Sequence, residues 1–218
     1  MSEISDRLDA IHERMNAACA RSGRDAASVE LMAVSKTFPS EAIREAVEAG
    51  QLLFGENKVQ EVLAKAPELP SKLRWHLIGH LQSNKVRKIL PLVDVVHSVD
   101  SLDLARDIQR IGAELGLFPK VYLEVNLAAE CTKHGFKPAE LREGGLEALY
   151  QLDRLHIQGL MCIPPAADPP APHFAFLGEI AKRNGLTALS MGMSGDFETA
   201  LALGATHIRV GSAIFGTR

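Results

Sequence analysis

From residue 29 to the C-terminus, short apolar runs of strand length alternate with longer runs of helical period. The strand-like runs cover residues 29–35, 52–54, 75–78, 93–97, 120–125, 156–162, 188–191 and 207–210. Helical runs between them cover residues 40–49, 56–66, 82–90, 101–115, 138–152, 173–183 and 195–203. Successive strands joined by helices pair in parallel, because a parallel neighbour needs a long crossover connection. Eight such strands predict an α/β fold closed into a single (β/α)8, or TIM, barrel.

An extra helix is expected before the first strand. Apolar residues recur with helical spacing over residues 4–19. Only a few residues follow the eighth strand, so the usual eighth outer helix has no counterpart, and we expect the N-terminal helix to cover that gap. The sequence has no interdomain linker, and residues 1–218 are expected to form one domain.

Local signals mark the boundaries of these elements. Asp100 is expected to cap the helix over residues 101–115, with Asp103 in its first turn. Four glycines each follow a helical run, where a left-handed residue is favoured: Gly50, Gly116, Gly185 and Gly204. The proline-rich stretch 164–172 is expected to be a stiff loop after the sixth strand.

Composition narrows the class of partner. The net charge of −3 and a pI near 6.2 give no reason to expect a nucleic acid or an anionic membrane. No apolar stretch approaches a membrane span, and the acidic N-terminus lacks the form of a signal peptide. Cys19, Cys131 and Cys162 show no CxxC spacing and fit reduced, mostly buried thiols. We therefore expect a cytoplasmic protein.

Lys36 is a single ammonium group that closes an otherwise apolar strand. At the C-terminal end of a barrel strand it would point into the mouth, where partial desolvation lowers the pKa of an amine. The neutral amine is the form that condenses with an aldehyde, so the position suits a Schiff base. The alternative is a lysine whose side chain reaches the surrounding water.

The loops after the last two strands favour an anion. Ser194 is placed to cap the following helix, whose first N–H groups would face a phosphate. After the eighth strand, Gly211 allows close approach of the backbone and Ser212 adds a hydroxyl group. Because barrels often hold phosphate after strands seven and eight, the two loops together predict a phosphate site.

Two further polar residues at strand ends each have two interpretations. Arg209 would form a salt bridge with a barrel carboxylate such as Glu124, or would donate a hydrogen bond to a ring nitrogen of a cofactor. Asn57 would orient a cofactor hydroxyl or cap the helix that follows it. His76 and His80 would lie roughly 13 Å apart in an extended chain, at about 3.3 Å per residue, so we expect no metal site from this pair, and the other histidines show no ligand spacing.

Six short motifs, spread in order over the whole chain, form a combination typical of one family. They are Ala33-Val34-Ser35-Lys36-Thr37, Phe54-Gly55-Glu56-Asn57, Trp75-His76-Leu77-Ile78-Gly79, Leu81-Gln82-Ser83-Asn84-Lys85, Met191-Gly192-Met193-Ser194 and Arg209-Val210-Gly211-Ser212-Ala213-Ile214-Phe215-Gly216. In these motifs the chain resembles the YggS/PROSC family, the pyridoxal 5′-phosphate (PLP) homeostasis proteins. The resemblance implies a barrel like the N-terminal domain of bacterial alanine racemase.

The resemblance also implies a cofactor and the residues around it. PLP would be held as an internal aldimine on Lys36, with Asn57 beside the ring and Arg209 near the pyridine nitrogen. The remaining residues implied for the cofactor site are Met191, Ser194, Gly211 and Ser212. Members are regarded as carriers or regulators of vitamin B6 without an established catalytic activity. The partners expected are therefore PLP itself and PLP-requiring apo-enzymes, and the protein is expected to be a monomer.

Three features depart from the family pattern. His80 stands where a small residue or proline is common, and His134 stands where serine or alanine is frequent. The stretch 164–172 is the third. None of these touches the proposed link to Lys36, so the departures concern the exposed face of the cofactor.

The sequence leaves a carrier and an enzyme as competing hypotheses. An amino-acid racemase needs a second acid or base on the opposite face of the ring. In the racemases that the chain resembles, a tyrosine supplies that group and a second domain completes the site. Tyr122 and Tyr150 are the tyrosines here, and neither lies at a predicted strand end. We therefore expect a carrier with at most feeble side activity, and the remaining alternative is a phosphate-binding barrel isomerase without a cofactor.

Overall fold

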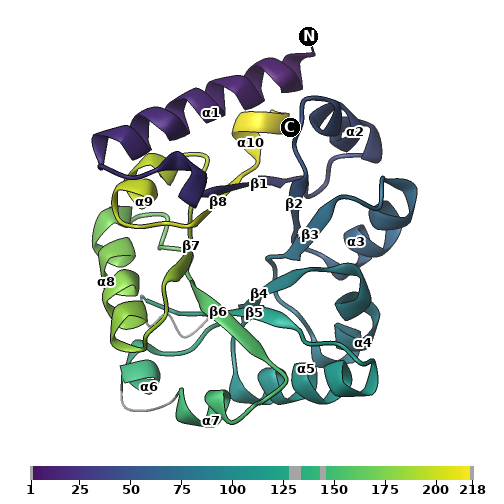
Figure 1. Cartoon of the computed structure of the whole chain (residues 1–218), viewed down its shortest axis with the longest axis vertical. Helices are drawn as coiled ribbons and strands as arrows, with labels where there is room; N and C mark the ends of the chain where they lie inside the picture. The colour runs from purple at the N-terminus through teal and green to yellow at the C-terminus, as the bar shows by residue number, and fades with distance from the viewer. Residues whose placement is uncertain (1, 128–133, 143–145, 217–218) are drawn as a thin grey trace.

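The predicted strands all form, and they pair in sequence order around a closed barrel in which β8 returns to β1. Their bounds are β1 Glu30–Val34, β2 Leu53–Glu56, β3 Arg74–Leu77, β4 Val95–Val99, β5 Lys120–Glu124, β6 His156–Met161, β7 Ala188–Met193 and β8 His207–Val210. This computed structural model describes residues 2–127, 134–142 and 146–216. Figure 1 shows the strands as a central ring with the helices outside it. The predicted α/β barrel is confirmed.

The helices alternate with these strands. They are α1 Glu3–Arg21, α2 Ser40–Glu48, α3 Val59–Lys65, α4 Val86–Ile89, α5 Leu102–Glu114, α6 Pro138–Arg142, α7 Glu147–Tyr150, α8 Pro170–Arg183, α9 Phe197–Ala202 and α10 Ser212–Phe215. Two predicted helices are wrong in extent: a 3₁₀ turn forms the start of 82–90, and 138–152 contains two separate helices. The short helix α10 was not predicted.

The N-terminal helix α1 covers the barrel beside β8 and β1, as expected (Figure 1). It packs against α9, α10 and α2. Its buried face repeats every three or four residues, with Ile4, Leu8, Ile11 and Met15 turned inward. Burial of each such side chain contributes about 1.5–3 kcal/mol, so α1 takes the place of an outer helix.

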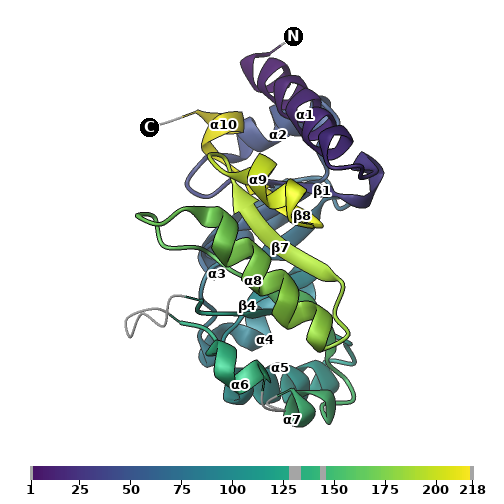
Figure 2. The same cartoon turned by 90° about the vertical axis from the view of Figure 1, so that its left-hand side faces the viewer.

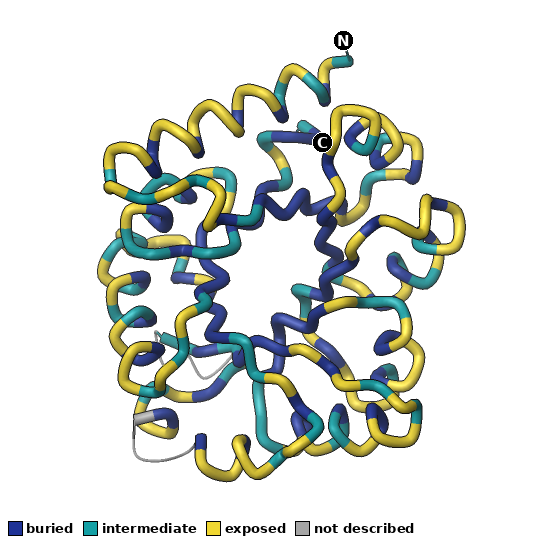
Figure 3. Tube along the Cα trace, in the orientation of Figure 1, coloured by how far each residue is buried: buried dark blue, intermediate teal, exposed yellow. Residues whose placement is uncertain are grey.

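The main apolar layer lies between the strands and the helices, and a smaller cluster is formed by Val95, Tyr122 and Met161. Figure 3 shows buried residues along the strands and along the inner face of each helix, with exposed residues outward. The strands are nearly continuous in burial, as expected for parallel strands covered by helices. None of the helices in the described ranges is long and apolar enough to cross a membrane.

Some of the predicted helix-boundary residues are confirmed, and one predicted cap is wrong. The four glycines Gly50, Gly116, Gly185 and Gly204 all have positive φ. Asp103 lies in the first turn of α5, but the N-cap is Ser101, whose Oγ accepts a hydrogen bond from the Leu104 N–H at 3.3 Å. Asp100 lies one residue too early to cap, so its carboxylate remains available for contacts outside the helix.

The prediction that residues 164–172 form a loop is correct only for the first part of the stretch. It leaves the barrel as a loop, which projects at the end where β6 terminates (Figure 2), but from Pro170 onward it is the first turn of α8. Proline is tolerated there because the first N–H groups of a helix have no partner within the helix. Cys19 and Cys162 are buried free thiols, as expected, whereas Cys131 lies outside the described residues.

Candidate functional site

A cavity of about 640 Å³ opens at the C-terminal ends of the strands. Six of the seven predicted site residues line it: Lys36, Asn57, Ser194, Arg209, Gly211 and Ser212. The seventh, Met191, is fully buried in the core, and Met193 lines the cavity in its place. Ligand sites of (β/α)8 barrels lie at this end, and the volume is in the range of small-molecule sites.

Lys36 lies two residues after the end of β1 and lines the cavity at its mouth. The residue is exposed and so accessible from the cavity, and the partial desolvation of its amine stays a prediction. The next residue, Thr37, has φ of +71°, a left-handed conformation that a β-branched residue rarely adopts. This turn directs the chain away from β1 immediately after the lysine.

A buried network lies beneath that turn. The Lys65 Nζ donates to the Ser35 carbonyl at 3.0 Å, to Glu56 Oε1 at 2.8 Å and to Glu61 Oε2 at 2.9 Å. The Ser35 hydroxyl donates to the same Glu56 oxygen at 2.7 Å, and the Thr37 N–H donates to Glu61 at 2.5 Å. The network therefore fixes the residues before and after Lys36.

On the wall next to β1, Ser194 joins the loops that follow β7 and β8. Its Oγ accepts hydrogen bonds from the Gly211 N–H at 3.2 Å and the Ala213 N–H at 3.4 Å. The expectation that Ser194 caps the next helix is wrong, because α9 begins later, with Asp196 as its N-cap residue. A Cβ at Gly211 would lie 3.2 Å from the Val34 carbonyl oxygen, so little space remains for a side chain there.

Arg209 on β8 is 4% exposed and is held by two hydrogen bonds. Its Nη1 donates to Ser190 Oγ at 2.7 Å and its Nη2 donates to the Cys162 carbonyl at 2.8 Å. Among the ion pairs of the described residues there is none between Arg209 and Glu124, so this predicted alternative is wrong. Burial lowers the pKa of Arg209, while the thiol of Cys162 and nearby carboxylates act in the opposite direction.

A column of polar side chains continues below Arg209 through the barrel. His97 contacts Ser190 Oγ through Nδ1 and His76 Nδ1 through Nε2, both at 2.9 Å. Burial lowers the pKa of His97 well below its ordinary value and that of His76 to about 3. The two imidazoles are therefore neutral at pH 7, and Arg209 is the cation at the top of the column.

Asn57 follows β2 and lines the cavity. It does not cap α3, whose N-cap residue is Lys58, so the capping interpretation is wrong. A Cβ on Gly79 would collide with the backbone of Asn57, so only glycine allows the two loops to pass so closely. The close approach places Asn57 beside the loop that follows β3.

Glu124 is a cavity residue that the sequence analysis treated only as a partner for arginine. Burial and the charge of Asp100 raise its pKa to about 7, and Arg209 acts against this shift. A carboxyl group that titrates near neutrality is poised for proton transfer. The signal was present in the sequence, because a charged residue ending an apolar strand is the same pattern that singled out Lys36.

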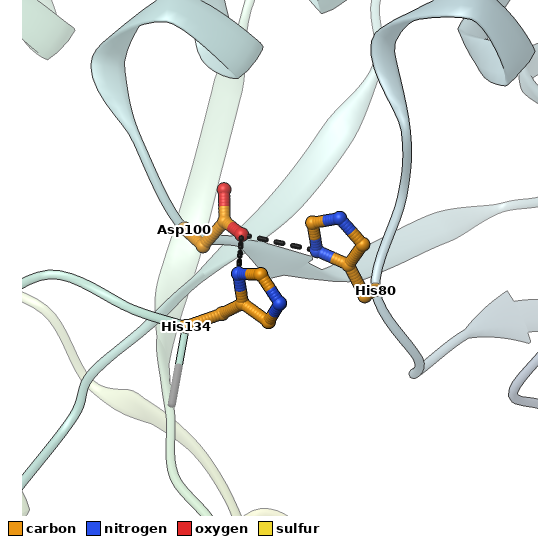
Figure 4. Close-up of side chains that lie close together, drawn as sticks. All are labelled: His80, Asp100 and His134. Atoms are coloured by element: carbon orange, nitrogen blue, oxygen red, sulfur yellow. Dashed lines mark ion pairs between the residues drawn. The ribbon is translucent and has the colours of Figure 1, made fainter. Parts of the chain in front are cut away.

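A second feature was missed because its members come from three separate loops. His80, Asp100 and His134 lie together at the mouth of the cavity (Figure 4). His80 and His134 are the two departures from the family pattern noted above, and both line the cavity. Residues 132 and 133, which precede His134 in the same departing motif, lie outside the described residues.

Comparison with known proteins decides the family. A family model described as alanine racemase, N-terminal domain, matches residues 7–218. The pyridoxal phosphate homeostasis protein of Pseudomonas aeruginosa is 45% identical over 227 residues, which cover 100% of this chain and 97% of the relative. The chain belongs to the family of pyridoxal phosphate homeostasis proteins. The resemblance inferred from its motifs is confirmed.

Solved structures agree with this family. PipY of Synechococcus elongatus is 45% identical, and the match covers 98% of this chain and 100% of PipY, with TM-scores of 0.86 for the structure without PLP and 0.84 for the structure with PLP bound. An alanine racemase of Clostridium difficile shares the fold at 15% identity and a TM-score of 0.74, covering 98% of this chain and 57% of the racemase.

Proposed function

We propose that this homeostasis protein binds PLP in the cavity at the barrel mouth and acts in intracellular PLP balance as a carrier or regulator. Lys36 holds the cofactor covalently through a Schiff base. The observation that carries the proposal is the position of Lys36, two residues after the end of β1, in one cavity with Ser194, Gly211 and Ser212. PLP, when bound, supplies an aldehyde that condenses reversibly with amines.

The donor set fits an aromatic aldehyde that carries a phosphate. Ser194 and Ser212 supply hydroxyl groups beside the phosphate, and the Gly211 and Ala213 N–H groups hold the Ser194 Oγ in position. Asn57 lies on the wall between these loops and the one after β3 and orients the ring. Lys36 supplies the amine that reacts with the aldehyde.

The position of Arg209 favours a carrier function over an enzymatic one. A guanidinium has five N–H donors, and two of them are engaged by Ser190 and Cys162 in this structure. Directed at the pyridine nitrogen, it leaves that nitrogen unprotonated, because arginine retains its own proton. An unprotonated ring is a weaker electron sink, so Arg209 binds and orients the cofactor while limiting its reactivity.

The alternative is a PLP-dependent amino-acid racemase. Neither tyrosine supports it: Tyr122 donates or accepts at His207 Nδ1 within the barrel, 3.1 Å away, and Tyr150 donates to the Asn184 carbonyl on the outside. Glu124 is the observation in its favour, because its pKa of about 7 suits a proton-transfer group in the cavity. The two functions therefore differ in whether Glu124 exchanges a substrate proton.

Titration of the protein with PLP tests the carrier proposal. We expect the wild type with PLP to show the absorbance band of an imine at about 420 nm, and we expect Lys36→Ala to lack this band. The exposed position of Lys36 means that the variant keeps its fold, which circular dichroism checks. Loading the wild type with PLP and adding each common amino acid then separates the alternatives: turnover at about 1 s⁻¹ or faster, abolished in Glu124→Gln, would establish the racemase instead.

Three finer statements complete the proposal. The protein is cytoplasmic, it is a monomer, and it delivers PLP to PLP-requiring apo-enzymes. Light scattering of the PLP-loaded protein measures its mass, and a dimer would contradict the second statement. Transfer to an apo-enzyme faster than spontaneous release of PLP would support the third, and transfer no faster than release would contradict it.

A further inference from the structure

Three metal-ligating side chains from different loops converge at the cavity mouth, outside the set that the proposed function uses. His80 follows β3, Asp100 follows β4, and His134 lies in the connection between β5 and α6. Both histidine Nδ1 atoms face the same carboxylate oxygen, Asp100 Oδ2, at 3.2 Å from His80 and 3.4 Å from His134. Figure 4 shows the two rings directed toward this oxygen from neighbouring loops.

The spacing of these donor atoms matches the ligand shell of a small metal ion. All three atoms lie within 4.8 Å of one another. Bonds of about 2.0–2.2 Å to a tetrahedral Zn²⁺ put any two ligands roughly 3.3–3.5 Å apart. The nitrogen-to-oxygen separations of 3.2 and 3.4 Å lie close to this value, so the donors are near enough to share one ion once the rings are oriented toward it.

Hydrogen bonds hold the backbone close to two of the three residues, His80 and His134. The Ser98 hydroxyl donates to the Gly79 carbonyl at 2.6 Å, directly before His80. On the other side of the cluster, the Asn126 N–H donates to the Phe136 carbonyl at 3.0 Å, and the Phe136 N–H donates to the Glu124 carbonyl at 2.8 Å. These bonds anchor the loop that presents His134.

Asp100 is the rigid member of the cluster. Its side chain is 10% exposed, against 42% for His80 and 59% for His134. Its second oxygen, Oδ1, accepts a hydrogen bond from the Ser101 hydroxyl at 3.2 Å, which leaves Oδ2 directed at the histidines. A held carboxylate with two adaptable imidazoles is an arrangement into which a cation can bind without a change of the fold.

We propose that His80, Asp100 and His134 form a binding site for a divalent transition-metal ion at the mouth of the cavity. Two imidazoles and one carboxylate are a ligand set of Zn²⁺ and its neighbours, whereas Mg²⁺ prefers oxygen ligands. The three protein ligands leave at least one coordination position open, and because His80 and His134 line the cavity, that position faces a molecule bound there.

One rearrangement accompanies binding. The two rings are stacked, with centroids 4.0 Å apart and planes 17° from parallel, so their in-plane lone pairs do not meet at one point. One imidazole turns about its side-chain bonds to bring both Nδ1 atoms onto the ion. The exposure of His134 permits this motion, and stacking is lost in the bound state.

Calorimetric titration of the protein with Zn²⁺, without added PLP, tests the site. The wild type is compared with His134→Ala and Asp100→Asn. The matched control is His173→Ala. His173 Nε2 lies 3.2 Å from Asp168, so this variant also removes a histidine–aspartate pair. Among the described residues no third metal-ligating side chain joins that pair, so it should not bind a metal ion. Circular dichroism confirms that each variant is folded, and Mg²⁺ replaces Zn²⁺ in a parallel titration.

We expect one equivalent of Zn²⁺ to bind to the wild type and to His173→Ala with equal affinity. Loss of a residue that merely supports a metal ligand costs about 10- to 100-fold in affinity, so His134→Ala and Asp100→Asn should each bind at least tenfold more weakly. Mg²⁺ should give no saturable signal. Absence of Zn²⁺ binding by the wild type, or less than a tenfold loss in either ligand variant, would overturn the three-ligand site. Because no PLP is needed, the outcome is independent of the proposed carrier function.

Discussion

The two sides of the cavity hold their charged residues in opposite ways. On the side of β1 and β2, which we call the lysine side, Lys65 and Glu56 form a buried ion pair beneath the turn that carries Lys36. The Glu56 side chain has no exposed surface, and Lys65 satisfies the Ser35 carbonyl as well. The contacts to the Ser35 carbonyl and the Thr37 N–H hold the backbone on both sides of Lys36.

On the side of β3 to β5, which we call the histidine side, two of the three clustered side chains are exposed and only Asp100 is largely shielded from solvent. His80 and His134 are exposed at the cavity mouth and share the one carboxylate oxygen of Asp100. Breaking a buried ion pair leaves an uncompensated charge and costs far more than losing an exposed pair. The comparison teaches that the proposed attachment point is built for rigidity, whereas the mouth opposite it can rearrange around a ligand.

The largest loss of stability is expected for Lys65→Met on the lysine side. The substitution keeps the apolar length of the side chain but leaves Glu56 buried without its cation. Removal of one partner of a buried pair costs about 3–5 kcal/mol, so the free energy of unfolding in urea should fall by that amount. The double variant with Glu56→Gln should regain part of the loss, because the buried charge is then absent.

Arg106→Met is the control for this comparison. Arg106 pairs with Asp103 on the outside of α5, where both side chains are largely exposed. An exposed pair contributes about 0–1 kcal/mol, so this variant should unfold near the wild-type urea concentration. Equal losses in Arg106→Met and Lys65→Met would show that the network beneath Lys36 has no special rigidity.

An intermediate, pH-dependent effect is expected for Glu124 on the histidine side. Its pKa in the folded protein is about 7, against an ordinary value of 4.5. A raised pKa contributes stability that is fully present below the ordinary value and is lost as the pH rises through about 7. At pH 8 the Glu124→Gln variant should therefore be more stable than the wild type, by about 3 kcal/mol.

Urea unfolding at pH 5 and pH 8 measures this difference. At pH 5 the folded wild type carries a protonated Glu124, so the wild type and Glu124→Gln should be nearly equally stable. If the difference in the free energy of unfolding between the two proteins is the same at pH 5 and pH 8, Glu124 does not titrate in this range. That result would contradict the buried environment described for it.

The smallest effect is expected for His134→Ala. The side chain is 59% exposed and packs against His80, so its removal uncovers no core. Substitutions at such positions change stability by about 0.5 kcal/mol or less. A thermal unfolding midpoint well below that of the wild type, in the absence of metal, would show that the histidine side is also a structural element and would erase the contrast between the two sides.

The fold was largely predictable because its signals are local. The strand 207–210 was predicted with its true bounds, since an apolar run ended by Gly211 leaves little choice of boundary. The strand predicted at 93–97 instead spans Val95–Val99, because Asp94 accepts the Trp75 N–H through its side chain and stays outside the ladder. A predicted helix cap was wrong for a similar reason. Ser101, rather than the preceding Asp100, is the N-cap residue of α5.

The site was predictable where one strand end supplies one residue, as at Lys36 and Arg209. It was not predictable where a contact depends on how separate loops meet. Ser194 was expected to cap a helix but bridges two loops, because its Oγ accepts the Gly211 N–H and α9 begins only after Asp196. The cluster of Asp100 with His134 depends on the bridge that places Phe136 beside Val125, and the period of the apolar residues does not predict that bridge.

The central claim is that the cavity binds PLP through Lys36. Reduction of the PLP-loaded protein with borohydride, followed by digestion and mass spectrometry, tests it most directly, because reduction makes the link permanent. We predict one phosphopyridoxyl group per chain, on the peptide that contains Lys36 and in the wild type only. A label on Lys65 or on another lysine, or a label retained at full yield in Lys36→Ala, would contradict the account.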